Sequence, residues 1–160
     1  MTTACAARPW AGPAGKRRSV KGMVHAEYDI QKGAYNSAGE ASADIKRKLQ
    51  QLGISPVTLR RVAVSSYEME MNIIIHSLGG TMGLCVDKDW ITLSSKDQGP
   101  GIEDVELAMS EGYSTADDDA RSMGFGAGMG LPNMKRNADD FRITSQLGEG
   151  TQITITFKVM

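Results

Sequence analysis

Glycine is concentrated in one third of this chain, and this concentration constrains the segment more than any other feature. Of 18 glycines in 160 residues, nine lie between Gly99 and Gly150. They follow no three-residue period, which excludes a collagen helix, and they stand among hydrophobic residues, which argues against a flexible linker. Glycine allows left-handed backbone and lets other groups lie against bare backbone. The segment therefore belongs to a folded domain.

The charge of the chain is divided unevenly. Residues 1–22 carry five basic side chains and no acid, so the other 13 of the 18 basic residues face all 19 acids, a formal charge of −6. An acidic body is poorly suited to a phosphate backbone, so nucleic acid is not expected as a partner. We expect residues 1–22 to be a basic, disordered extension and residues 23–160 to form one domain. Two alternatives stay open for the extension: a translation start at Met23, or a tail that docks on an acidic partner or a membrane.

Hydropathy and cysteine content exclude further classes of protein. No apolar run approaches the roughly 18 residues of a membrane span, and the N-terminus lacks the apolar core of a secretory signal. Cys5 and Cys85 are too few for a disulfide framework or a metal cluster. We therefore expect a cytoplasmic protein with no membrane partner.

Hydrophobic periodicity predicts strands in adjacent pairs with helices between them. The predicted strands are 24–30, 82–86, 90–95, 141–146 and 152–159. The predicted helices are 37–52, 57–76, 103–110 and 131–139. This order favours an α+β fold, a two-layer sandwich with its helices on one face. A doubly wound parallel sheet would need a helix after nearly every strand.

Glu68 and Asn72 stand four residues apart in the predicted helix 57–76, so both side chains share one helix face. His76 continues the row one turn later, as a wall of the same site or as a core histidine. A carboxylate can take a proton from a hydroxyl or a water, and an amide oxygen is a hard ligand that suits Mg²⁺. Polar pairs at this spacing are commonly solvated surface, so the pair alone does not define a site.

Two glycine-containing turns follow predicted strands. Asp97-Gln98-Gly99-Pro100-Gly101 comes after the strand 90–95, and Gly148-Glu149-Gly150-Thr151 joins the last two strands. Both are compatible with ordinary turns. In the functional interpretation, Asp97 accepts a hydrogen bond from an exocyclic amine such as that of adenine, and the glycines let the base lie against bare backbone.

Gly124, Gly126, Gly128 and Gly130 stand at alternate positions before the predicted helix 131–139. Exposed backbone N–H groups in such a nest, together with a helix N-terminus, suit a polyphosphate. The segment is not a P-loop, because no Gly-Lys-Ser/Thr follows, and it is not a Rossmann turn, because no βαβ unit surrounds it. A surface loop is the alternative.

The order and spacing of these four motifs resemble the GHKL (Bergerat-fold) ATPases, the superfamily of histidine kinases, gyrase B, the Hsp90 chaperone and MutL. The resemblance covers about residues 24–160. It implies a two-layer α/β sandwich with a mixed, mostly antiparallel sheet, helices on one face and a glycine-rich ATP lid.

A bare domain of this length is similar to the serine/threonine kinases of bacterial partner-switching systems, the anti-sigma-factor and stressosome-switch kinases. The similarity is carried by residues 97–102, by Gly112-Tyr113-Ser114-Thr115 and by Gly130-Leu131-Pro132. It implies an enzyme that transfers the γ-phosphoryl of Mg·ATP to a serine or threonine of a small antagonist protein. A sigma factor or a phosphatase is the further partner that it suggests, and a homodimer stays open.

The resemblance also implies a role for each matched residue. Glu68 is the expected general base, and Asn72 is the expected ligand of Mg²⁺. Asp97 is expected to bind the adenine amine, with Thr151 close by. The glycines expected at the adenine pocket are Gly99 and Gly101, and those expected over the phosphates are Gly124, Gly126, Gly128 and Gly130.

Two other functions would use the same motifs. One is a nucleotide-dependent binding module that sequesters a sigma factor or another partner without phosphorylating it. The other is an ATP hydrolase, or a catalytic domain that serves a histidine-bearing partner in trans. The protein kinase is preferred because this chain supplies no histidine-bearing helical domain.

Overall fold

The structure is a computed structural model that describes residues 24–113, 116, 118 and 129–159. Its centre is a five-stranded sheet in the order β1-β2-β3-β5-β4, in which every pairing is antiparallel. The strands are β1 (Val24–Ile30), β2 (Gly80–Val86), β3 (Trp90–Asp97), β4 (Asp140–Gln146) and β5 (Gly150–Lys158). The helices are η1 (Tyr35–Ser37), α1 (Glu40–Gln51), α2 (Pro56–His76), α3 (Val105–Ala108) and α5 (Gly130–Asn137).

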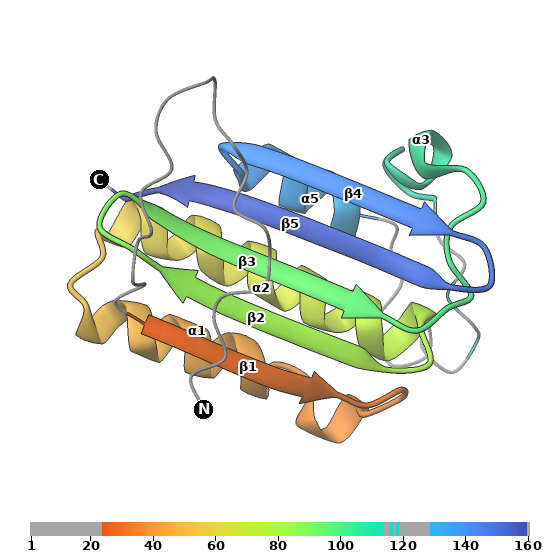
Figure 1. Cartoon of the computed structure of the whole chain (residues 1–160), viewed down its shortest axis with the longest axis horizontal. Helices are drawn as coiled ribbons and strands as arrows, with labels where there is room; N and C mark the ends of the chain where they lie inside the picture. Colours follow the sequence, from red (N-terminus) through yellow and green to blue (C-terminus); the bar gives the residue numbers. More distant parts are fainter. Residues whose placement is uncertain (1–23, 114–115, 117, 119–128, 160) are drawn as a thin grey trace.

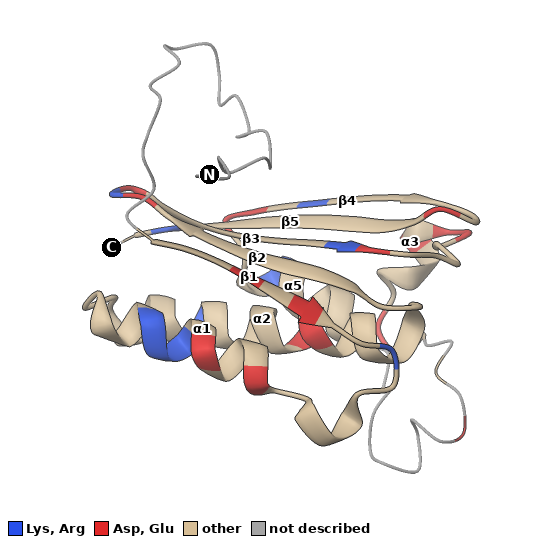
Figure 2. Ribbon diagram, turned by 60° about the horizontal axis from the view of Figure 1, so that its bottom comes forward, with Lys and Arg blue, Asp and Glu red and all other residues tan. Residues whose placement is uncertain are grey.

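Helices α1, α2 and α5 cover one face of the sheet, with α2 packed against both of the others (Figures 1 and 2). Successive side chains of a strand point to opposite faces of the sheet, so apolar residues at alternate positions gather on the one face that the helices cover. On β3, Ile91 and Leu93 are fully buried in the core, whereas Lys96 is exposed. The α+β two-layer sandwich predicted from the sequence is confirmed.

Strand register places the ends of the sheet. Ile30, Gly80 and Asp97 lie side by side at one end, where β3 finishes. Val24 and Lys158 lie at the other end, where β1 begins and β5 finishes. The hairpin of β4 and β5 turns at the same end as Asp97 (Figure 1).

Helix α2 begins at Pro56, within one residue of the predicted start at residue 57. Ser55 is its N-cap, and the Ser55 hydroxyl accepts a hydrogen bond from the N–H of Thr58 at 3.4 Å. Pro56 occupies the first turn, where no intrahelical partner for an N–H is needed. Val62 and Met69 of α2 are fully buried in the core. Because this packing fixes the rotation of the helix, it also sets the direction in which the side chains on its other faces point.

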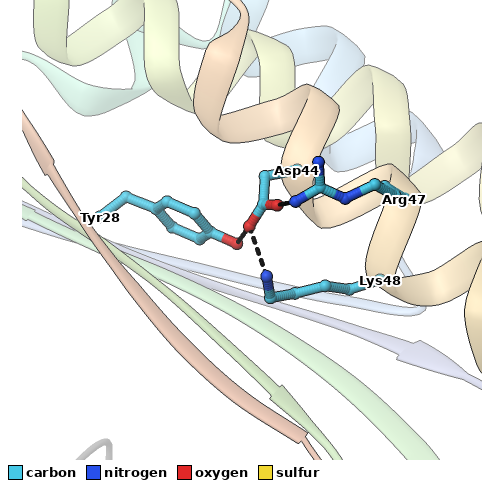
Figure 3. Close-up of polar contacts among 4 residues, drawn as sticks. All are labelled: Tyr28, Asp44, Arg47 and Lys48. Carbon is cyan, nitrogen blue, oxygen red and sulfur yellow. Dashed lines mark hydrogen bonds and ion pairs between the residues drawn. The ribbon is translucent and has the colours of Figure 1, made fainter.

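Helix α1 is tied to strand β1 by a polar cluster (Figure 3). The Tyr28 hydroxyl donates to Asp44 at 2.7 Å, and the Lys48 ammonium donates to the same carboxylate oxygen at 2.7 Å. Arg47 contacts the other oxygen. Hydrogen bonds from Lys48 and Tyr28 lower the pKa of Asp44, while burial and the neighbouring carboxylate raise the pKa of Tyr28. The cluster therefore holds a neutral phenol against a charged carboxylate.

The first helix departs from the sequence prediction at both ends. It starts at Glu40 rather than at residue 37, because Gly39 adopts a left-handed conformation with φ of 94°. Residues 35–37 form the 3₁₀ helix η1 instead. The helix ends at Gln51, one residue before the predicted end, and Leu52 beyond it is 36% exposed.

Several predictions fall outside the described residues. They concern the basic extension 1–22 and three of the four glycines expected over the phosphates, Gly124, Gly126 and Gly128. Within the described part of the chain, no helix combines the length and the apolar character that crossing a membrane requires.

Candidate functional site

A cavity of about 880 Å³ opens at the end of the sheet where β3 finishes. Its walls come from α2, from the ends of β3 and β5, from the α3 region and from the start of α5. The residues predicted for the site that line this cavity are Glu68, Asn72, Asp97, Gly101, Gly130 and Thr151. The structure thus brings together residues that lie up to 83 positions apart in the sequence.

One wall of the cavity is a single face of helix α2. Glu68, Asn72 and His76 are spaced one turn apart, and all three line the cavity. Oε1 of Glu68 accepts a hydrogen bond from Nδ2 of Asn133 in α5, at 3.1 Å. The face that the sequence predicted is therefore turned to the cavity, with one carboxylate oxygen held by a neighbouring helix.

Glu70, two residues from Glu68, is turned the other way and is 2% exposed. Its carboxylate accepts the backbone N–H groups of Gly39, Ala41 and Ser42, at 3.1, 3.3 and 3.0 Å. The N-cap residue Gly39 offers no side chain for this purpose. Glu70 therefore caps α1 from a distance and belongs to the framework of the site.

The opposite wall is formed where β3 ends. Oδ1 of Asp97 accepts the backbone N–H of Thr151 at 3.1 Å, which fixes the carboxylate at the mouth of the β4–β5 hairpin. Burial raises the pKa of Asp97, and the hydrogen bond from Thr151 opposes this effect in part. No hydrogen bond to the other oxygen, Oδ2, is found among the described residues, and a half-buried carboxylate oxygen is suited to accept a hydrogen bond from an amine of a bound ligand.

Glycine is required where this turn meets the hairpin. Gly101 has φ of 82° and Gly150 has φ of 126°. A Cβ on Gly101 would overlap the carbonyl of Gln146, and one on Gly150 would overlap the carbonyl of Asp97. Gly99, expected at the adenine pocket, does not line the cavity; its N–H donates to the backbone carbonyl of Glu149 in the hairpin at 3.3 Å. These glycines therefore let two turns approach until their backbones touch.

Gly130 stands at the start of α5, directly against the polar face of α2. A Cβ there would lie 3.2 Å from Oε2 of Glu68 and 3.4 Å from Oδ1 of Asn72. The first distance is tighter than ordinary packing and the second is at van der Waals contact, so the bare backbone of Gly130 leaves more space beside these two oxygens than any larger residue would.

The described lining of the cavity is acidic and partly apolar. Its charged members are five acids with no lysine or arginine, and Figure 2 shows part of this acidity at α3. An anionic ligand bound here would need a cation to offset the carboxylates. In the ranges described, no three His, Cys, Asp or Glu side chains converge as a metal cluster. The amide oxygen of Asn72, which lines the cavity beside Gly130, is a group that could hold a cation together with oxygens from a ligand and water.

Two residues that contribute to this site, Asn133 and Ser145, were not predicted from the sequence. Asn133 follows Gly130 by three residues and so shares its helix face, a spacing that could have indicated it. Ser145 lies opposite Thr151 in the hairpin, and its hydroxyl accepts the N–H of Ile102 at 2.7 Å and contacts the Thr151 hydroxyl at 2.9 Å. Counting the hairpin register outward from its turn would have found Ser145.

Comparison with known proteins identifies a family and several relatives of this chain. Residues 63–160 match the family model described as histidine kinase-, DNA gyrase B- and HSP90-like ATPase. The chain is 34% identical over 108 residues to the serine/threonine-protein kinase RsbT of Bacillus subtilis, covering 65% of this chain and 75% of that protein. It is 34% identical over 103 residues to the anti-sigma F factor of Clostridium acetobutylicum, covering 61% and 67% of the two chains.

A solved structure shares the fold. The crystal structure of the SiaB–SiaC complex from Pseudomonas aeruginosa matches with a TM-score of 0.57 and 12% identity, over 82% of this chain and 88% of that one. At this identity the match concerns the fold alone. The family model covers more than half of the chain, including every described residue predicted for the site. The chain belongs to the histidine kinase-, DNA gyrase B- and HSP90-like ATPase family.

Proposed function

We propose that this protein is a serine/threonine kinase of a partner-switching system, which transfers the γ-phosphoryl group of ATP to a small antagonist protein. The observation that supports this most directly is the pairing of Glu68 with Asn72 on one wall of the cavity and Asp97 on the other. The relatives named as a serine/threonine-protein kinase and as anti-sigma factors support the same assignment. Their names also favour a protein as the second substrate.

The lining of the cavity suggests how a bound ATP molecule would be oriented. The adenine amine donates to Oδ2 of Asp97, and the base packs on apolar side chains such as Ile102 and Ile153. The phosphates then extend along the Glu68–Asn72 face of α2, toward the start of α5. Gly130 and the sequence before it are proposed to close over them.

Asn72 is the proposed protein ligand of Mg²⁺. Its amide oxygen faces the cavity beside Gly130, and an amide oxygen suits a hard cation. When bound, Mg²⁺ neutralises phosphate charge that the acidic walls of this cavity would otherwise repel. The role of this chain is to hold the phosphates and the acceptor hydroxyl in line.

Glu68 is the proposed general base. Oε2, the oxygen not held by Asn133, takes the proton of the acceptor hydroxyl as that hydroxyl oxygen attacks the γ-phosphorus. The bond from the γ-phosphorus to its bridging oxygen breaks, and the electron pair leaves with ADP. Positioning and charge neutralisation supply most of the rate in such transfers, and the base adds to them.

Replacing Glu68 with glutamine tests the base directly. Glu68→Gln is expected to keep ATP affinity while lowering phosphoryl transfer by about a hundredfold or more, because an amide cannot accept the hydroxyl proton. Transfer is measured with labelled ATP and candidate antagonist proteins, and acid-stable label identifies phosphoserine or phosphothreonine. Exposed Glu40, replaced by glutamine, is the matched control. Full activity of Glu68→Gln would remove this residue from the role.

The same assay separates the kinase from its alternatives. A partner that binds in the presence of ATP but never acquires label would indicate a sequestering module. Release of ADP without any labelled protein would indicate a hydrolase, and acid-labile label on a partner would indicate histidine phosphorylation in trans.

Replacing Asn72 with alanine tests the metal site. Asn72→Ala is expected to lose measurable Mg·ATP binding in calorimetry, whereas exposed Asn36→Ala should bind normally. With EDTA present the parent should bind ATP weakly as well, because the amide oxygen acts through the cation. An unchanged Mg·ATP affinity in Asn72→Ala contradicts the assignment.

A further inference from the structure

We infer that Asn133 is a positioning residue that orients the Glu68 carboxylate for proton transfer and couples it to helix α5. This inference deepens the proposed function and rests on it. Asn133 lies one turn into α5, and Nδ2 donates to Oε1 of Glu68 at 3.1 Å in a partly buried setting. No other side-chain hydrogen bond to Glu68 is found among the described residues.

The amide of Asn133 has a defined orientation. Its oxygen faces Nη1 of Arg136 at 3.4 Å, while its nitrogen faces the Glu68 carboxylate. A flipped amide would place NH₂ against the guanidinium and oxygen against the carboxylate, so both contacts would become repulsive. The donor is therefore held toward Glu68 by charge on both sides.

The backbone that carries Asn133 is also fixed. Its N–H donates to the carbonyl of Met129 at 2.9 Å, and its carbonyl accepts Nδ2 of Asn137 at 2.8 Å. Asn133 is thus held within α5 from both directions. A shift of this helix would carry the donor with it.

The two oxygens of Glu68 are divided between two tasks. Oε1 accepts from Asn133, and Oε2 lies beside Gly130, where the missing side chain leaves it open to the cavity. Locking one oxygen removes rotation of the carboxylate, so the other keeps a constant direction toward an incoming hydroxyl. Asn133 acts through Glu68 in this scheme and touches no reacting atom.

Helix α5 follows the segment that contains the alternating glycines, and Arg136 of α5 pairs with Glu111 just before that segment at 2.5 Å. This pair is exposed, so its own contribution is small. The contacts from Glu111 through Arg136 and Asn133 nevertheless form a continuous line to Glu68. Placement of α5 and placement of the carboxylate are therefore linked.

Two variants separate the donor from the packing. Asn133→Ala removes the side chain, and Asn133→Asp keeps its shape but replaces the donor with a like charge. Both are expected to lower kcat for transfer to an antagonist protein by between about tenfold and a hundredfold, with KM for ATP within about twofold of the parent. Asn36→Ala is the matched control, and thermal melting confirms that each variant is folded. Normal kcat in both Asn133 variants overturns the inference.

A double-mutant cycle identifies the partner through which Asn133 acts. In the Glu68→Gln background, Asn133→Ala should cost little further activity, because the base it positions is already absent. Losses that multiply in the double variant would show that Asn133 acts elsewhere, which overturns the inference.

A spectroscopic test needs no substrate protein. The side-chain amide NMR signal of Asn133, assigned by its loss in Asn133→Ala, should shift in Glu68→Gln and stay in place in Glu40→Gln. An unshifted signal in Glu68→Gln overturns the contact. A parent that transfers phosphate to no protein overturns the proposed function and this role with it. An active parent with active Asn133 variants overturns the positioning role alone.

Discussion

Replacing Asp97 with asparagine is expected to weaken ATP binding by about a hundredfold while leaving the folded domain at least as stable as the parent. The proposed contact is a hydrogen bond from the adenine amine to a carboxylate, a type worth about 1.5–3 kcal/mol. An asparagine that keeps its oxygen on the Thr151 N–H turns its own NH₂ toward the amine, so the contact becomes unfavourable. Calorimetry with Mg·ATP measures the loss.

The stability half of this prediction follows from the raised pKa of Asp97. Burial raises this pKa above the unfolded value of about 3.9, so the folded state holds its proton more tightly than the unfolded state. Above that value the ionised carboxylate costs stability, and asparagine removes this cost while keeping an acceptor for Thr151. Urea unfolding at neutral pH should therefore give an equal or higher midpoint.

The same shift predicts how ATP affinity depends on pH. Acidification protonates Asp97 and removes the acceptor, so the affinity of the parent should fall as pH drops through the raised pKa. Exposed Asp29→Asn should keep both the affinity and its pH dependence. Normal ATP binding by Asp97→Asn would show that the base lies elsewhere in the cavity.

Replacing Glu70 with alanine is expected to destabilise the framework of the site strongly. It leaves the N–H groups of Gly39, Ala41 and Ser42 without their acceptor and removes a negative charge from the positive end of α1. The unfolding free energy should fall by about 3 kcal/mol, and the melting temperature by on the order of 10 °C. Circular dichroism during urea and thermal unfolding measures both.

The control for this prediction lies on the same helix. Glu40 is exposed in the first turn of α1, and Glu40→Ala should cost well under 1 kcal/mol. Glu70→Gln should fall between the two, because it keeps one acceptor oxygen and loses the charge. A loss below about 1 kcal/mol in Glu70→Ala would show that water replaces the carboxylate at the end of α1.

The sequence was most informative where local signals and packing agree. Strand β1 has the predicted bounds. Its side chains alternate between partly buried and exposed, as expected for an edge strand with one face covered by helices. The start of α2 lies within one residue of its predicted position, and the shared helix face predicted for Glu68 and Asn72 is the one that lines the cavity. The turn at Gly148 predicted the hairpin of the last two strands, but only the family resemblance implied that Thr151 lies near Asp97, where its N–H donates to the carboxylate.

Contacts between distant segments could not be read in the same way. Glu70 has the same residue type as Glu68 and lies two positions away, yet its partners are backbone groups about 30 residues earlier in the chain. Helical periodicity turns Glu70 away from the Glu68–Asn72 face but does not identify its partners. Asn133 meets Glu68 across 65 residues, and that contact depends on how α5 packs on α2. Helix boundaries also failed where one left-handed glycine, Gly39, delayed the start of α1.

The antiparallel register has a practical consequence for experiments. The chain enters the sheet at Val24 and leaves it after Lys158, and both residues lie at the end opposite Asp97. A strand of seven residues separates the two ends by about 20 Å. A fluorophore attached at Val24 or Lys158 therefore begins well away from the nucleotide. Such labels can follow association with a partner protein by energy transfer while ATP is titrated independently.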